Sequence, residues 1–220
     1  MVTPVANAGM QPYANFPATT GPRVAPTVNK TGRVIISQPG TYSGWNITAG
    51  NIDIQSNGGA VILQDFVVDS RGTTAGGPIW TRGGFTSPVE VRYGRIIGAG
   101  NVGSTCVNML QPFGWAHNLD LSNCEDGFRA GHNTVIEANW VHGLYMGTAS
   151  HNDGIQLQGT EQDVEIRLNR IDGRFRGQTS ASSSRATPTT SRGSTCIRTT
   201  CPAVPTRPTC TTPGPSAPRL

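Results

Sequence analysis

The residues that decide the fold are His151-Asn152-Asp153-Gly154-Ile155-Gln156-Leu157-Gln158-Gly159. Asp-Gly is typical of a turn. The alternation that follows predicts a short strand with Ile155 and Leu157 on one face and two glutamines on the other. A related stretch runs from Glu125 to Gly131, and its Asp-Gly pair lies 27 residues earlier in the chain. Recurrence of the same turn and strand indicates a structural repeat.

A second pattern supports the repeat. The order apolar-x-apolar-x-x-Asn-x-apolar fits Val164 to Ile171 and, with a weak first position, Thr134 to Val141. Short strands joined by tight turns cannot bury their apolar faces alone, so stacked copies are expected to form a β-solenoid. We expect Asn139 and Asn169 to occupy sharp bends, because Asn tolerates positive φ, and to hydrogen-bond along the stack.

The repeats predict about six coils. Their first strands begin near residues 34, 53, 80, 107, 128 and 155. In the last two coils Phe128, Ala130, Ile155 and Leu157 are expected to point inward. Arg129 is then expected one coil from Gln156, and Asp126 one coil from Asp153.

The run from about Arg33 to Asp172, with "HNDGIQLQG" followed by "VEIRLNRI", resembles right-handed parallel β-helix proteins of the pectin-lyase-like superfamily, of the bacterial secreted or phage tail type. The predicted fold class is therefore all-β, a right-handed parallel β-helix. This scaffold hosts lyases, hydrolases, epimerases and adhesins, so the resemblance predicts the fold and leaves the function open.

Composition divides the chain into three parts: an N-terminal arm or linker at 1–29, a β-helix domain at 30–175, and a disordered Ser/Thr/Pro/Arg-rich tail at 176–220. An alternative for the tail is that it is translated out of frame. All 13 acidic residues lie between Asp53 and Asp172, and the tail holds six Arg. The remainder has 17 − 6 = 11 basic residues against 13 acidic ones, a net charge of −2. A body with this balance does not predict a nucleic-acid partner.

Five cysteines are present. The odd number argues against a closed disulfide framework, and Cys106 and Cys124 are expected to be small core residues rather than a bridge. Cys196, Cys201 and Cys210 lack the spacing of a zinc site. No stretch approaches transmembrane length, and no signal peptide is recognisable. An extracellular or virion location is expected, with a homo-oligomer as a further expectation, a trimer in the case of a phage tail protein.

Polar residues are expected to share one outer face of the solenoid. Arg129, Gln156 and Gln158 follow from the strand alternation, with Asp126 and His132 nearby and Trp80 from an earlier coil as a stacking surface. Amides, an arginine, carboxylates and an aromatic ring on a flat face suit sugar binding. The alternative is that Asp126 and Asp153 only cap turns, and that the glutamines are ordinary solvated positions.

The resemblance also implies catalytic roles. β-Helix lyases of acidic polysaccharides hold Ca²⁺ with carboxylates and use a basic residue to abstract the proton, which would assign Asp126 and Asp153 to the metal and Arg129 to the base. A His151–Asp153 pair would suit an epimerase. Ca²⁺ prefers six to eight oxygen ligands, and only these two carboxylates and Glu125 are at hand, so no cofactor is assigned firmly. The prediction is a polysaccharide-recognising protein. The alternatives are a lyase, epimerase or hydrolase of an acidic glycan and a purely structural virion protein.

Overall fold

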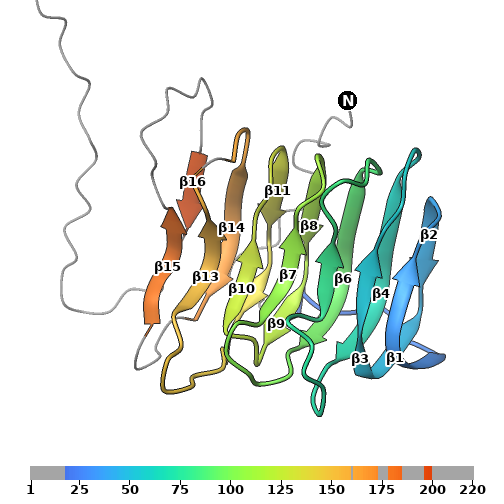
Figure 1. The fold of residues 1–220 in the computed structure, drawn as a ribbon, viewed down its shortest axis with the longest axis horizontal. Helices are drawn as coiled ribbons and strands as arrows, with labels where there is room; N and C mark the ends of the chain where they lie inside the picture. Colours follow the sequence, from blue (N-terminus) through green and yellow to red (C-terminus); the bar gives the residue numbers. More distant parts are fainter. Residues whose placement is uncertain (1–17, 160, 173–177, 185–195, 200–220) are drawn as a thin grey trace, which may run out of the picture.

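The computed structural model describes residues 18–159, 161–172, 178–184 and 196–199, and secondary structure in these residues consists of β-strands without helices. All strand pairs are parallel, and the strands stack side by side in coils (Figure 1). The chain passes through three faces in each coil, named here faces I, II and III. The predicted all-β parallel β-helix of about six coils is confirmed.

Each face is a ladder of strands from successive coils, and long strands bend and serve two faces. Face I is built from the C-terminal parts of β1 (Val28–Ile36) and β3 (Trp45–Ile54), followed by β5 (Ile79–Thr81), β7 (Thr105–Met109), β10 (Asp126–Arg129), β13 (Asn152–Leu157) and β15 (Gln178–Ser184). Face II is built from β2 (Gly40–Ser43), the N-terminal parts of β4 (Val61–Asp69) and β6 (Val89–Ile97), β8 (Gly114–His117), β11 (Thr134–Glu137), β14 (Glu165–Ile171) and β16 (Cys196–Thr199). Face III contains the remaining parts of β1, β3, β4, β6 and β14, together with β9 (Asp120–Ser122) and β12 (Trp140–Val141).

The core is a set of apolar rows that run along the coil axis. On face I the register joins Val34, Ile52, Ile79, Val107, Phe128 and Ile155. The predicted inward residues Phe128, Ala130, Ile155 and Leu157 are all buried. The predicted starts at 53 and 80 are one residue late, because Ile52 and Ile79 are the core residues of those coils.

One residue makes each corner between faces II and III, and it has positive φ. These residues are Gly44, Asp65, Tyr93, Asn118, Ala138 and Leu168. The prediction that Asn139 and Asn169 make the bends is therefore wrong, since the residue before each carries the positive φ. A left-handed Leu or Tyr is unusual, and its position here shows that pairing on both sides of the corner outweighs local preference.

The predicted hydrogen bonding between the two asparagines is confirmed. Asn139 and Asn169 are fully buried. Asn139 Nδ2 donates to Asn169 Oδ1 at 2.9 Å and to the Ala116 carbonyl at 3.0 Å. Asn139 Oδ1 accepts the Leu119 N–H at 3.0 Å. The side chains thus satisfy backbone groups that the corner leaves unpaired, and they bind three successive coils together.

Gly94 makes room for the largest side chain in the core. It pairs with Phe66 of the preceding coil, and a Cβ built at Gly94 would lie 2.2 Å from Phe66 Cζ. We expect Gly94→Ala to lower the free energy of unfolding by about 1–3 kcal/mol, the usual cost of overpacking a filled core. Urea unfolding measures this change. Gly94→Ala/Phe66→Leu should regain part of the loss, and no loss in the single variant would contradict the packing described here.

Residues 18–27 of the predicted arm run beside the corner between faces II and III; residues 1–17 lie outside the described residues. The Gly21 N–H donates to the Asn118 carbonyl at 3.1 Å. Arg23 Nη2 donates to Asp65 Oδ2 at 2.6 Å, and its guanidinium lies 4.0 Å from the centre of the Tyr93 ring. The segment therefore contacts the positive-φ corner in three coils before β1 begins.

Two described strands fall within the predicted tail. β15 pairs with β13 on face I, and β16 pairs with β14 on face II. β15 and β16 therefore extend face I and face II, respectively, by one strand beyond residue 175. The remaining residues of the predicted tail lie outside the described residues.

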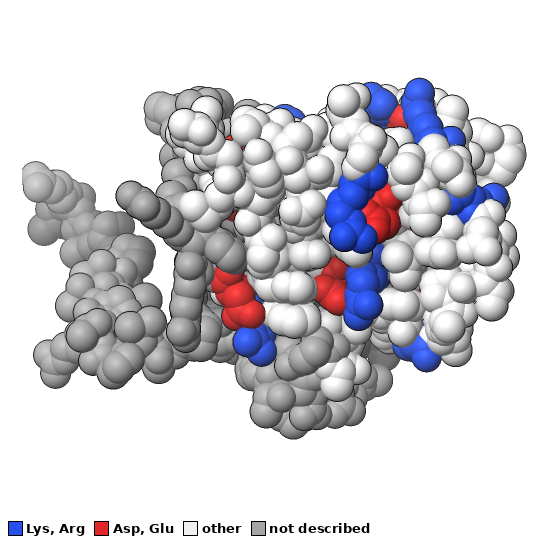
Figure 2. All heavy atoms as spheres, turned by 90° about the horizontal axis from the view of Figure 1, so that it is seen from below, with Lys and Arg blue, Asp and Glu red and all other residues white. Residues whose placement is uncertain are grey.

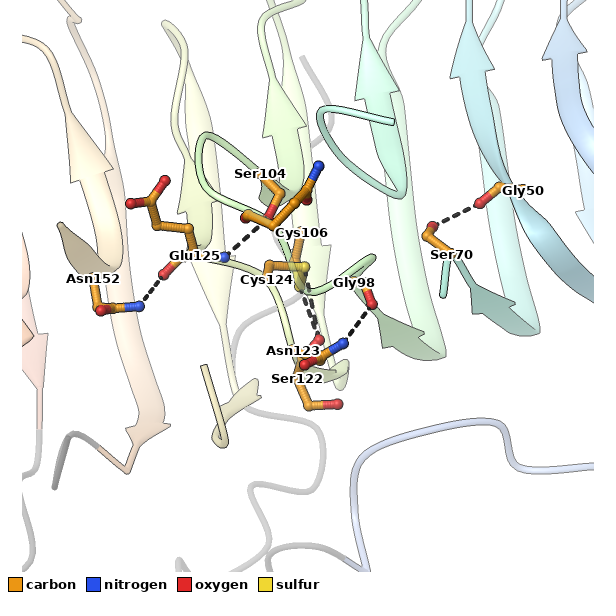
Figure 3. The surroundings of a disulfide bond; sticks show 11 residues. Gly50, Ser70, Gly98, Ser104, Cys106, Ser122, Asn123, Cys124, Glu125 and Asn152 are labelled. Carbon is orange, nitrogen blue, oxygen red and sulfur yellow. Dashed lines mark hydrogen bonds between the residues drawn. A yellow bond between two sulfur atoms is a disulfide. The ribbon is translucent and has the colours of Figure 1, made fainter. Parts of the chain in front are cut away.

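A disulfide joins Cys106 and Cys124, so the expectation that they are separate core residues is wrong. The two cysteines lie 18 residues apart in sequence, and their Cα atoms are 5.5 Å apart. Cys106 begins one coil and Cys124 ends it, so a single turn of the solenoid brings them together (Figure 3). The buried bridge closes a covalent ring around that coil.

Candidate functional site

A row of side chains crosses the outer side of face I, one from each coil. The pairing register joins Asp53, Trp80, Asn108, Arg129 and Gln156. Adjacent strands lie about 4.8 Å apart, so five positions span roughly 19 Å. Trp80, Arg129 and Gln156 were predicted to share this face, and the structure places them in one line. We call these five residues the face I row.

Two arginines hold the carboxylate at one end of the row. Arg82 donates to Asp53 through Nε at 2.9 Å and Nη2 at 2.8 Å, and Arg33 Nη2 also donates to Asp53. Burial alone would raise the pKa of Asp53, but the bonds from Arg82 and Arg33 outweigh it, so that pKa is lowered. The Arg82 guanidinium lies 5.2 Å from the centre of the Trp80 ring. Asp53 therefore stays ionised, and Arg82 is fixed beside the indole.

The middle of the row is rich in hydrogen-bond donors. Asn108 is 2% exposed, and among the described residues its Nδ2 has no partner. A Cβ at Gly77 would lie 3.2 Å from Trp80 Nε1 and 3.3 Å from Asn108 Nδ2, so both nitrogens are close to this glycine. Buried donors without acceptors are uncommon in folded proteins. These groups are complementary to ligands that offer oxygen acceptors.

Arg129 extends the donor set along the row. Its Nη2 donates to Gln158 Oε1 at 2.5 Å, which places predicted residue Gln158 beside the row. Its Nε has no partner among the described residues. A guanidinium held by a neighbouring amide presents its remaining N–H groups in a fixed direction, which suits a carboxylate or a pair of hydroxyl oxygens.

The predicted carboxylates stack at the corner between faces III and I, and they are buried rather than on the open face. Glu125, Asp126 and Asp153 are 5%, 9% and 5% exposed. Asp126 Oδ1 accepts the Asp153 N–H at 2.9 Å, and Glu125 Oε1 accepts the His151 N–H at 2.8 Å. Burial raises the pKa of Asp126 to about 7; the charges of Asp153 and Glu125 add to the rise, and the Asp153 N–H opposes it.

Asp126 gives the fold a pH dependence. Its raised pKa means that the folded state holds the proton more tightly than the unfolded state. The stabilisation is therefore complete below about pH 4 and is lost as the pH rises through about 7. Relative to Asp126→Asn, the wild-type protein should lose about 2–4 kcal/mol of unfolding free energy between about pH 4 and pH 8. Denaturant titrations of both proteins measure this difference, and parallel pH profiles would contradict it.

The remaining predicted site residue, His132, lies apart from the row. It is exposed in the turn between faces I and II, where its Nδ1 accepts the Gln162 N–H at 3.2 Å. Among the described residues no group of three or more His, Cys, Asp or Glu side chains is placed to hold a metal ion. Within the part of the chain that the structure describes, no helix is long and apolar enough to cross a membrane.

Charged groups on the other two faces are mostly paired with one another. On face II, Arg167 donates to Glu137 at 2.8 Å and to Glu165 at 2.5 Å. On face III, Asp120 binds His142 at 2.7 Å and Arg95 at 2.9 Å. The side of the molecule in Figure 2 likewise shows basic residues beside acidic ones within a largely uncharged surface. Such pairing leaves little charge for a ligand on these faces.

Comparison with known protein families, with characterised proteins and with solved structures finds no match to this chain. The fold is thus established by strand pairing, and function has to be argued from the site itself.

Sequence reasoning missed Asn108 and the two arginines around Asp53. Asn108 follows the strand start at Val107 as Arg129 follows Phe128, so the repeat register contained the signal. The arginines come from different coils, and only the fold brings Arg33 and Arg82 to the same carboxylate.

Proposed function

We propose that the protein recognises an acidic polysaccharide through the outer side of face I. The observation that carries the proposal is the register of the face I row, which aligns an indole, an amide, a guanidinium and a second amide over four coils. The ring offers a stacking surface, and the polar groups offer bonds to carboxylate and hydroxyl oxygens. Within and beside the row, Arg33, Arg82 and Arg129 outnumber the carboxylate of Asp53, while Glu125, Asp126 and Asp153 are buried at the corner with face III, which favours an anionic ligand.

The setting we propose is the cell exterior or a virion, with membership of the pectin-lyase-like superfamily. Disulfides persist in oxidising environments and are rare in the cytosol of most organisms. The Cys106–Cys124 bridge supports this setting. A repeating face with one contact in each coil also suits a ligand that is itself a repeating chain.

Arg129→Ala tests the proposal. A screen against uronate-containing and neutral glycans identifies the ligand, and calorimetry then gives the affinity. The variant should bind about 1.5–3 kcal/mol more weakly, the usual contribution of a hydrogen bond to a charged group. Its unfolding free energy should change by no more than about 0.5 kcal/mol. Arg71→Ala is the matched control, because Arg71 is an exposed arginine paired with Asp69 outside the row. Equal affinities in the two variants would contradict the proposed site.

A second candidate function is catalysis on the same glycan. The observation that favours it is the carboxyl of Asp126, whose pKa of about 7 suits proton transfer near neutral pH. The predicted catalytic groups Arg129, His151 and Asp153 lie nearby in the chain: Arg129 is on the same strand as Asp126, Asp153 is on the neighbouring strand β13, and His151 directly precedes β13. Appearance of unsaturated sugar or new reducing ends, abolished by Asp126→Asn, would establish an enzyme; binding without product would leave recognition alone.

A further inference from the structure

The outer side of face II carries a groove that the proposed function does not use. Its volume is about 390 Å³. The register of Val61, Val89 and Gly114 places its walls in two rows along the coil axis. The apolar members of these rows are Ala60, Pro88 and Phe113 on one side, and Ile62, Trp115 and Val135 on the other. Phe113 is 53% exposed.

The groove favours an apolar ligand. Its carboxylate, Glu90, already binds Arg92 at 2.7 Å and His117 at 2.9 Å. Its amide, Asn133, donates to the Pro112 carbonyl at 2.9 Å. The groove therefore offers few free polar groups to which a sugar could hydrogen-bond. An added β-strand is excluded as well, because β4, β6, β8 and β11 are paired on both sides.

One polar group in the lining still lacks a partner. The Trp115 indole nitrogen is buried, and among the described residues it has no acceptor. A polyproline II segment is apolar, needs no backbone donors from its receptor, and keeps its own carbonyl groups available. Aromatic grooves with such an N–H are suited to proline-rich segments. The groove therefore has the chemistry of a polyproline receptor.

The chain itself contains a segment with the matching repeat. Pro202, Pro205 and Pro208 recur at every third residue, with Arg207 between the last two. Polyproline II has three residues per turn and a rise of about 3.1 Å, so these prolines would lie about 9.3 Å apart. Two coil steps of about 4.8 Å give about 9.6 Å. Alternate coils of the groove and successive turns of the segment therefore have nearly the same period.

We propose that Pro205 and Pro208 dock in this groove of the same molecule, Pro205 at the coil of Phe113 and Trp115 and Pro208 two coils earlier at Ile62. Arg207 then lies near the intervening coil, which carries Glu90. The last described residue, Thr199, ends β16 and pairs with Asn169, directly past the corner between faces II and III. From there to Pro205 is six residues, which reach about 20 Å. Three coil steps and the width of the face also require about 20 Å, so the connection is extended.

Photo-crosslinking of the full chain tests the proposal. Phe113 is replaced by the photoreactive benzoylphenylalanine, and the irradiated protein is digested with trypsin for mass spectrometry. The expected product joins the peptide containing residue 113 to the peptide Thr199–Arg219 within one chain, because trypsin does not cleave between Arg207 and Pro208. Pro205→Ala/Pro208→Ala should reduce its yield severalfold, while Pro213→Ala/Pro215→Ala should not. Crosslinks that join two chains, or that do not depend on Pro205 and Pro208, would overturn the proposal.

A binding measurement separates a true groove contact from mere proximity. The full chain carrying Pro205→Ala/Pro208→Ala leaves the groove open, and a labelled peptide of residues 200–212 is added to it. The peptide should bind this variant about tenfold more tightly than the wild-type chain, a difference of about 1.4 kcal/mol. Adding Trp115→Ala should remove the gain. Equal binding to all three proteins, or no binding to any, would overturn the proposal. Glycan binding at face I is independent of this result.

Discussion

Asn139→Ala should lower the free energy of unfolding by about 3–5 kcal/mol, because each buried polar group left without a partner costs about 1–3 kcal/mol. The substitution leaves the Leu119 N–H and the Ala116 carbonyl unpaired, and it removes one bond to Asn169. These groups belong to three adjacent coils, so the loss should affect the cooperativity of unfolding as well as its midpoint. Urea denaturation followed by circular dichroism measures both.

Asn46→Ala is the matched control. Asn46 also bonds to an asparagine of the neighbouring coil, with its Nδ2 2.9 Å from Asn29 Oδ1, but this pair is exposed to solvent. Water can replace the lost bond there, so the expected change is below about 0.5 kcal/mol. Similar losses of unfolding free energy in the two variants would show that the buried hydrogen bonds of Asn139 have no special role in the stability of the fold.

Removing the disulfide is expected to have the second largest effect. Cys106→Ala/Cys124→Ala should lower the free energy of unfolding by about 3 kcal/mol, the value for a closed loop of roughly this length in the chain-entropy description. The two bridged cysteines lie 18 residues apart in the sequence, and both are buried in the core. Thermal unfolding with and without reductant measures the effect, since only the bridged protein should respond to the reductant.

A variant with Cys196→Ala, Cys201→Ala and Cys210→Ala serves as the background for this comparison, so that the three other cysteines cannot exchange with the bridge. Mass spectrometry of the unreduced digest should find the two cysteine peptides linked. Free thiols at both positions, or a melting temperature that does not respond to reductant, would contradict the bridge.

Much of the fold could be predicted from two short stretches. The 27-residue spacing of the Asp-Gly pairs gave the register of Arg129 with Gln156, and the inward positions of Phe128 and Ile155 follow from it. The errors arose where the repeat length changes. Loops of different length at the corners change the repeat length, so repeat spacing alone placed the strand starts near 53 and 80 one residue after the core residues Ile52 and Ile79. The residue at each corner was also unpredictable, since the pairing on both sides forces Leu168 and Tyr93 into positive φ.

The candidate site was predicted in part, and the rest depends on contacts between distant coils. Trp80, Arg129 and Gln156 could be placed because each follows a core residue at the same point of its strand. The position of Asp53 between two arginines could not be predicted, because Arg33 and Arg82 lie 20 and 29 residues away from Asp53 in the sequence. Pairing of Cys106 with Cys124 depends equally on coil length, because this coil is short, 128 − 107 = 21 residues between paired positions, and so brings two cysteines 18 residues apart to bonding distance.

We propose that face I, and not face II or III, binds the glycan. Each face carries a tryptophan, so the three faces can be compared directly. Trp80, Trp115 and Trp140 are partly exposed on faces I, II and III, respectively. The most direct measurement is the affinity of Trp80→Ala, Trp115→Ala and Trp140→Ala for the glycan identified by screening, each with its melting temperature. We expect Trp80→Ala alone to weaken binding, by about tenfold or more. Unchanged affinity in Trp80→Ala, together with a loss in either of the other two variants, would contradict it.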